Sequence, residues 1–271
     1  MSNEQTPAGG NPYSSPFATL DKDPVHADGT LVPEGKSIDV GQAVSWFGRG
    51  FELFKRSPGI WVVSVIILFL IMVVIGLVPF LGNLATSLLY PVFGGGLMIG
   101  CHAVASDEDL EIEHLFAGFK DKFGPLLMVG VFYLIGMIGI VVVAGILGVA
   151  VVGSAGMGAL LGGNQAGAVF GAGLGFGLLL VVLVAVALSI PLAMALWFAP
   201  ALVVFHGLTP VEAMKSSFRG CLKNIVPFLV YGIVYFVLAI VASIPLFLGW
   251  LVLVPVVIAS IYAGYRDIYL A

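Results

Sequence analysis

The sequence predicts an all-α, polytopic membrane protein with six transmembrane helices, and three observations carry this prediction. Hydrophobic residues make up 60% of the 271 residues and charged residues 10%, whereas charged residues average roughly 25% in soluble domains. The mean hydropathy is +1.11. Six apolar runs are each long enough to cross the roughly 30 Å hydrocarbon core of a bilayer, and lysines and arginines lie between these runs or at their ends.

The chain is expected to divide into a disordered cytoplasmic tail, residues 1–36, and a six-helix transmembrane domain, residues 37–271. The tail contains five prolines among glycine, serine and asparagine, with few apolar residues. Such a segment cannot bury enough surface to order itself. The peptide Asn11-Pro12-Tyr13 is an alternative docking motif, although solvation of the whole tail is the simpler interpretation.

The six crossings are predicted at residues 59–78, 84–105, 125–152, 174–205, 227–244 and 251–266. The turn after the first crossing and the turn after the fifth contain no charge. Between the third and fourth crossings we expect a glycine-rich connection, because glycine disfavours regular helix.

Small residues and prolines in and near the crossings are candidate helix-packing or path-lining positions. A proline followed by three glycines predicts a kink or local break in the second crossing; Pro191 and Pro200 are expected to bend the fourth, and Pro255 to interrupt the sixth. Four glycines recur every fourth residue, which places them on one helix face where helices approach closely. A pore-lining zipper is the functional alternative to tight packing or a flexible loop. The set is Pro91, Gly94, Gly95, Gly96, Gly163, Gly167, Gly171, Gly175, Pro191 and Pro255.

An amphipathic helix is predicted over residues 209–227, directly before the fifth crossing. Thr209 and Glu212 form a capping box, and Pro210 occupies the first helical position, where its missing N–H costs nothing. One face of the helix is apolar, and the other carries three candidate cytoplasmic docking residues: Lys215, Arg219 and Lys223. Looser versions of this helix precede the first and third crossings, at residues 39–58 and 109–125.

The basic residues predict the orientation in the membrane. All 11 lysines and arginines precede the first crossing, lie between crossings two and three or four and five, or end the sixth. The other three loops have none. By the positive-inside rule, the N- and C-termini are both expected in the cytoplasm.

The chain also suggests three parallel repeats. Each unit has an amphipathic helix, a proline (Pro58, Pro125 or Pro227), a crossing, an uncharged turn and a proline-containing crossing. Real repeats of this kind are related by an axis along the membrane normal. The alternative is that any chain of membrane hairpins shows some such rhythm.

Sites for chemistry are scarce. No Asp, Glu, Lys or Arg lies inside a crossing, which argues against a pump, a proton-coupled transporter or an intramembrane hydrolase. The acids of residues 107–121 suit a helix start, where the dipole favours them, better than a metal site. Zinc ligands are conceivable among Cys101, His102, His114, His206 and Cys221, but their spacing matches no metal motif. We therefore expect no metal, no cofactor and free thiols, and the net charge of −4 indicates no nucleic-acid partner.

Two segments resemble an uncharacterised family of bacterial inner-membrane proteins. They are the run PALVVFH at residues 200–206 leading into TPVEAMKSSF at 209–218, with Asn224 and Pro227 beyond, and the ending YAGYRDI at residues 262–268. More distantly, crossings four and five resemble the membrane-anchoring domain of glycerophosphoryl diester phosphodiesterases. The resemblance implies a six-helix domain of the bacterial inner membrane. Hydrolase activity is not carried over, because nothing in this chain could hold that enzyme's soluble catalytic barrel.

The function expected from the sequence is that of a non-enzymatic membrane scaffold, assembly or regulatory component. Its expected partners are the lipid bilayer and another membrane protein or a second copy of itself. The alternative is a passive transporter or channel for an uncharged or lipid-like substrate, with Pro91, Pro191 and Pro255 marking broken helices around a path. An enzyme is not expected, because no nucleophile–base pair can be named.

Overall fold

The computed structural model describes residues 29–79, 81–120 and 122–271, so most of the predicted tail lies outside the described residues. Apart from one isolated antiparallel bridge between Leu31 and Leu270, the regular structure of these residues is helical. The elements are α1 (Val40–Arg56), α2 (Pro58–Gly76), α3 (Leu81–Ala105), the 3-10 helix η1 (Ile112–Phe119), α4 (Phe123–Leu161), the 3-10 helix η2 (Gly163–Gln165), α5 (Ala166–Trp197), α6 (Ala199–His206), α7 (Pro210–Lys223), α8 (Ile225–Ser243) and α9 (Trp250–Tyr269).

Six helical stretches are long and apolar enough to cross a membrane, which confirms the predicted all-α class and the number of crossings. They are α2, α3, α4, α5 continued by α6, α8 and α9. The bounds of α2, α3, α8 and α9 lie within about one helical turn of the predicted crossings. The capping box of Thr209 and Glu212 is also present, and the hydrogen bonds from Thr209 hold the pKa of the Glu212 carboxyl below its usual range.

The glycine-rich connection is where the prediction is wrong. In the structure α4 continues to Leu161 and α5 begins at Ala166, so only a short turn separates them. Glycine costs about 1 kcal/mol in a helix interior, but here it permits close packing of the two helices. A Cβ at Gly173 would be 3.2 Å from the Cβ of Ala155, and a Cβ at Gly177 would overlap Val151.

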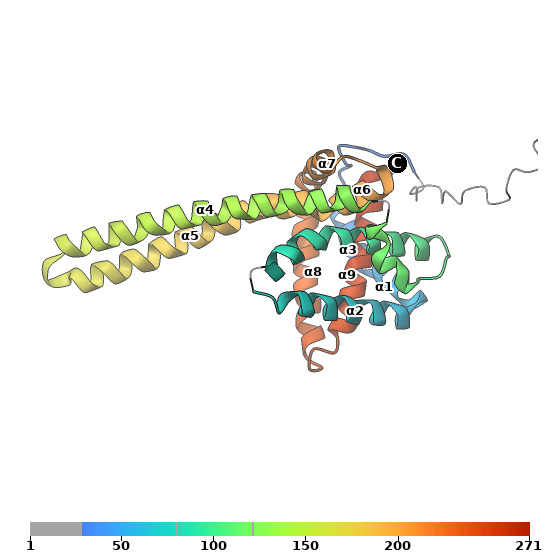
Figure 1. Cartoon of the computed structure of the whole chain (residues 1–271), viewed down its shortest axis with the longest axis horizontal. Coiled ribbons are helices and arrows are strands. Elements are labelled where there is room, and N and C mark those ends of the chain that lie inside the picture. The colour runs from blue at the N-terminus through green and yellow to red at the C-terminus, as the bar shows by residue number, and fades with distance from the viewer. Residues whose placement is uncertain (1–28, 80, 121) are drawn as a thin grey trace, which may run out of the picture.

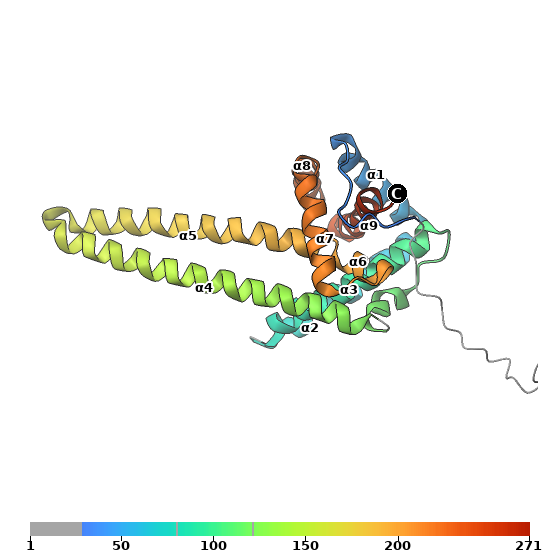
Figure 2. The same ribbon diagram turned by 90° about the horizontal axis from the view of Figure 1, so that it is seen from above.

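Three apolar hairpins, α2–α3, α4–α5 and α8–α9, extend from one shared helical region, and they do not all point the same way. Figure 1 shows the α4–α5 hairpin projecting far beyond the others, and in Figure 2 α8 and α9 are seen nearly end-on. The α8–α9 hairpin therefore runs across the direction of α4–α5. We call this shared region the hub: α1, η1, α6 and α7, with residues 91–105 of α3 and 253–269 of α9. The hub contains most of the fully buried side chains, whereas the hairpins expose apolar ones, as lipid-facing helices do.

The three units of the predicted repeat are α1 with α2–α3, η1 with α4–α5, and α7 with α8–α9. They pack against one another in a ring. In each unit the amphipathic element packs against the hairpin of another unit: α1 against α8–α9, η1 against α2–α3, and α7 against α4–α5. A ring of three units is the arrangement that three repeats predict.

Equivalent glycines make two of these contacts possible. A Cβ at Gly50 of α1 would lie 2.5 Å from the carbonyl oxygen of Val256, and a Cβ at Gly118 of η1 would overlap the carbonyl oxygen of Val92. Both valines directly follow the proline inside their helix, at positions 255 and 91. The amphipathic elements of the first and second units thus touch the partner hairpin at the same place in the repeat.

The third contact of the ring is polar. The Ser217 hydroxyl of α7 donates to the carbonyl oxygen of Met194 at 2.6 Å and accepts the backbone N–H of Phe198 at 2.9 Å. Phe198 lies where α5 ends and α6 begins. The helix therefore breaks just before Pro200, and a buried serine satisfies the backbone group released there.

At three other prolines, where a kink or a break was predicted, the helix is not broken. Helix α3 continues through Pro91, α5 through Pro191 and α9 through Pro255. Proline in a helix interior costs roughly 3 kcal/mol, and at Pro91 and Pro255 this cost is offset by burial in the hub.

Residues 29–38 form an ordered segment across the hub, which we call the strap. The backbone N–H groups of Val32 and Lys36 donate to the carbonyl oxygens of Tyr269 and Ile268 at 2.8 and 2.7 Å. Ser216 of α7 donates to the carbonyl oxygen of Pro33 at 2.6 Å. The prediction of disorder is therefore wrong for residues 29–36, because backbone hydrogen bonding to a distant segment supplies what the segment's own composition lacks.

Candidate functional site

The polar groups of the hub gather around the end of α9, the YAGYRDI segment at residues 262–268. Its tyrosines are buried and contact two of the histidines whose spacing matched no metal motif. The Tyr262 hydroxyl lies 2.9 Å from Nδ1 of His102, and the Tyr265 hydroxyl lies 2.5 Å from Nε2 of His206. Within the described ranges, no three His, Cys, Asp or Glu side chains lie within reach of a common metal ion.

Asp267 joins α9 to α1. Both of its carboxylate oxygens accept from the Arg49 guanidinium, with 2.9 Å between Nη1 and Oδ1, and Oδ2 also accepts Nε1–H of Trp46 at 2.9 Å. The Asp267 side chain is 20% exposed and that of Arg49 44%. A bidentate, charge-assisted pair of this kind fixes the position and the plane of the guanidinium.

Replacing Asp267 by asparagine is expected to destabilise the protein by about 2 kcal/mol, because a charged acceptor shared by Arg49 and Trp46 becomes a neutral amide. Thermal unfolding in mild detergent measures this loss. The matched control is Glu52→Gln, since Glu52 pairs with Lys55 on an exposed surface where such pairs contribute about 0–1 kcal/mol. Equal stability of the two variants would contradict the role given to Asp267.

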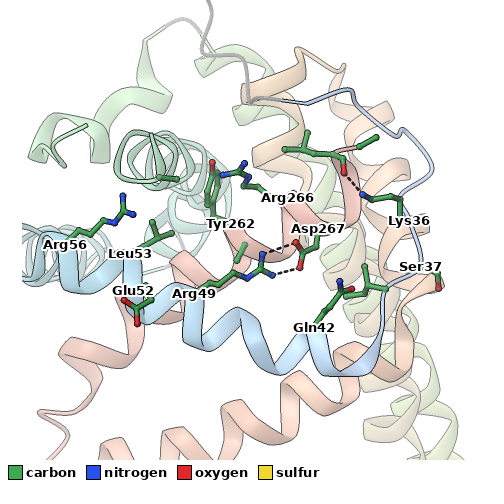
Figure 3. A pocket seen from close by; sticks show the side chains of 15 residues that line it. Lys36, Ser37, Gln42, Arg49, Glu52, Leu53, Arg56, Tyr262, Arg266 and Asp267 are labelled. Carbon is green, nitrogen blue, oxygen red and sulfur yellow. Dashed lines mark hydrogen bonds and ion pairs between the residues drawn. The ribbon is translucent and has the colours of Figure 1, made fainter. Parts of the chain in front are cut away.

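A groove of about 690 Å³ opens beside this ion pair, between the strap, α1 and α9 (Figure 3). Its walls are about equally polar and apolar and carry four basic side chains against two acidic ones. The lining residues are Lys36, Ser37, Ile38, Gln42, Arg49, Glu52, Leu53, Arg56, Ala105, Tyr262, Ala263, Arg266, Asp267, Leu270 and Ala271.

Two of the three predicted docking residues have partners within the chain. Arg219 pairs with Glu34, and Lys223 donates to the carbonyl oxygen of Gly35 at 3.1 Å, so both hold the strap. Lys215 is exposed on α7. The spacing of basic residues along α7 could not reveal this, because their partners lie about 190 residues away in the chain.

The candidate packing glycines separate into two groups. Gly95 and Gly96 are packed tightly, since a Cβ would lie 2.8 Å from Leu126 at the first and 2.5 Å from the His114 carbonyl oxygen at the second. Gly94 is only in ordinary contact range, 3.6 Å from Pro200. By contrast, no described atom lies within 4 Å of a Cβ at the stripe Gly163, Gly167, Gly171 and Gly175. The glycines that let α5 approach α4 are Gly173 and Gly177, in another register.

Cys101 and Cys221 are buried free thiols, as predicted. Burial raises the pKa of the Cys221 thiol to about 12. The thiolate is the reactive form, and each pH unit below the pKa reduces its fraction tenfold, so roughly one Cys221 in ten thousand is ionised at pH 8.

Maleimide labelling of the folded protein at pH 8 is therefore expected to leave Cys221 almost unmodified, whereas labelling in denaturant modifies it fully. Intact-mass analysis before and after denaturation checks this. Raising the pH toward 12 without unfolding should increase the rate, because the thiolate fraction grows. Rapid labelling of native protein at pH 8 would contradict the buried position of α7.

The groove residues were missed by sequence reasoning because they come from both ends of the chain. The expectation that no crossing contains a charge is wrong for the end of the sixth, because Arg266 and Asp267 lie within the last span. These two residues, with Arg49 on the amphipathic helix α1, are the signal that could have found the groove. Opposite charges at such positions predict a pairing between the first and last helices of the hub.

Together the fold and the hub define the class: an all-α, polytopic membrane protein with six candidate spans. The chain is 32% identical over 203 residues, 73% of each chain, to a probable inner membrane protein of Burkholderia thailandensis. It therefore belongs to the family of that probable inner membrane protein, which supports the predicted inner-membrane location. No family model and no solved structure matches the chain. The resemblance to the membrane domain of glycerophosphoryl diester phosphodiesterases is not tested by these comparisons and stays an expectation.

Proposed function

We propose that the protein is a non-enzymatic scaffold, assembly or regulatory component of the inner membrane, and that the hub is its recognition surface. One observation supports this. Among the described residues, every Asp, Glu, Lys and Arg lies in the strap, in α1 and its cap, in residues 106–122, in α7, or in the last turn of α9. The hairpins hold the hub at the membrane, and recognition by charge belongs to the hub.

The amphipathic elements of the hub also expose large apolar side chains. On α1, Val44 is 45% exposed and Phe51 44%; on α7, Leu222 is 49% exposed, and Lys215 lies beside this apolar surface. An exposed surface that mixes apolar and basic groups suits the bilayer interface and a second membrane protein or another copy of this chain.

The same distribution supports an orientation with the hub and both termini in the cytoplasm. The turns at the far ends of the hairpins carry no charge, whereas all the described basic residues lie in the hub, in the strap or in residues 106–122 beside it. Under the positive-inside rule, the hub belongs on the cytoplasmic side.

Cysteine labelling tests this orientation. A cysteine in place of Phe247, which is 68% exposed in the α8–α9 turn, is expected to react with a membrane-impermeant maleimide in intact spheroplasts. A cysteine in place of Lys215 should react only after lysis. The native thiols are buried, so the unmodified protein gives the background. The reverse labelling pattern would overturn the orientation.

Photo-crosslinking in cells tests the scaffold function. A photoreactive residue at Val44, Phe51 or Lys215 of the hub is expected to give one discrete protein adduct. The control positions are Val141 and Leu183, which are 65% and 56% exposed on the long hairpin. Adducts that are equally frequent at both sets of positions, or absent from the hub, would count against the proposal.

The alternative of a passive transporter rested on helices broken at Pro91, Pro191 and Pro255. Because all three helices are continuous through these prolines, that argument no longer applies. A liposome flux assay over a metabolite panel is expected to show neither leak nor uptake.

A further inference from the structure

We propose that the groove between α1 and α9 binds a phosphate group, carried by an anionic lipid headgroup or by a free phosphate ester. The site does not depend on the scaffold function proposed above. Its volume of about 690 Å³ falls in the range of roughly 300–1,000 Å³ typical of small-molecule sites.

The groove has an excess of positive charge. Lys36, Arg49, Arg56 and Arg266 line it, against Glu52 and Asp267. Two further charges neutralise lining residues from outside: Lys55, whose Nζ lies 2.9 Å from Glu52, and Asp107, which lies 2.6 Å from Arg56. Counting side chains alone, five positive and three negative groups give an excess of two positive charges, which favours an anion.

Several guanidinium donors remain available. Nη1 of Arg56 donates to Asp107 and to the carbonyl oxygen of Val104, at 2.6 and 2.8 Å, which leaves its Nη2 and Nε groups. Arg266 has no ion pair among the described residues. In Figure 3 Arg49 and Arg56 rise from α1, and Arg266 comes from α9 with Tyr262 between it and Arg56.

Arginine suits this role because its planar guanidinium matches two phosphate oxygens at once. The Asp267 carboxylate and the end of α3 fix Arg49 and Arg56 in advance, so little side-chain freedom is lost on binding. The carbon-rich side chains of Leu53, Ile38 and Ala263 supply an apolar wall beside the charged one.

The position of the groove matches the level of lipid headgroups. Arg56 is the last residue of α1, two residues before the first span begins at Pro58. Arg266 lies in the last turn of the sixth span. Both guanidinium groups therefore lie at the hub ends of candidate membrane spans, where headgroup phosphates are found.

The test is ligand-dependent thermal stabilisation of the full chain in a neutral detergent. The probes are short-chain phosphatidylglycerol, phosphatidylcholine, glycerol phosphate and inorganic phosphate. We expect a saturable rise in Tm with phosphatidylglycerol and at most a small one with phosphatidylcholine. An equal rise with glycerol phosphate or inorganic phosphate would support the site and assign its ligand to the free phosphate class.

Arg266→Gln is the decisive variant, because Arg266 has no ion pair whose loss would unfold the protein. It is expected to weaken the apparent affinity at least fivefold, with Arg266→Lys in between, while leaving the ligand-free Tm unchanged. Lys215→Gln removes the same charge from the hub surface outside the groove. An equal loss of affinity in Lys215→Gln would show a general attraction to basic residues and overturn the proposal, as would the absence of any rise with the anionic probes.

Discussion

Replacing Gly50 by alanine is expected to lower the free energy of unfolding by about 3 kcal/mol. The added Cβ would lie 2.5 Å from the carbonyl oxygen of Val256 and 2.8 Å from the backbone nitrogen of Ser260. Backbone atoms cannot rotate away as a side chain does, so α1 must move off α9. That movement also disturbs the ion pair between Arg49 and Asp267.

The matched control is Gly48→Ala in the same helix. Gly48 is exposed, and no atom lies within 4 Å of a Cβ there. Alanine is better in a helix interior by up to about 1 kcal/mol, so this variant should be as stable as the original protein or slightly more stable. Unfolding in mild detergent compares the two, and a Gly50→Ala protein as stable as Gly48→Ala would refute the close contact. If the three units are equivalent, Gly118→Ala should be as harmful as Gly50→Ala, because it clashes with Val92 at the matching position.

The second large effect is expected at Asn224, which is fully buried and ties the strap to α7. Its Oδ1 accepts the backbone N–H of Ile38 at 2.9 Å, and its Nδ2 donates to the carbonyl oxygens of Lys36 and Gly220, both at 2.8 Å. Leucine has a similar size and makes none of these bonds. Each buried polar group left without a partner costs about 1–3 kcal/mol, so Asn224→Leu should lose about 3 kcal/mol in total.

This variant should also release the strap locally. Limited trypsin digestion is expected to cleave after Lys36 faster than in the original protein, as read from the size of the remaining fragment. Asn83→Leu is the control, because the Asn83 side chain is exposed at the far end of α3. An unchanged cleavage rate after Lys36 in Asn224→Leu would contradict the role of Asn224.

The strap shows why the prediction for the N-terminal segment failed. Its composition is that of a solvated tail, and nothing within residues 29–36 predicts order. Order comes from the end of α9, whose carbonyl groups accept from Val32 and Lys36, and from Asn224. Glu34 pairs with Arg219, a predicted docking residue whose side chain stays 54% exposed.

The long hairpin and the prolines show a different limit. Glycine and proline predict interruptions because of their own backbone preferences, which are worth roughly 1–3 kcal/mol. In α4 and α5, packing of Gly177 against Val151 outweighs that preference. In α3 and α9, burial of Pro91 and Pro255 does the same. The helix does break just before Pro200, where a bend was predicted, and there Ser217 accepts the backbone N–H of Phe198.

The sequence by itself determined the number of spans, the capped start of α7 and the collection of charge outside the hairpins, apart from the end of α9. Each of these depends on hydropathy, on residues within one turn of each other, or on charge count, so local chemistry decides them. Only the tertiary structure decided the strap, the glycine contacts of Gly50 and Gly118, and the groove with Arg49 and Arg266 on its walls. These join segments that are far apart along the chain, and their stability comes from close packing and buried hydrogen bonds that exist only once the ring of three units has closed.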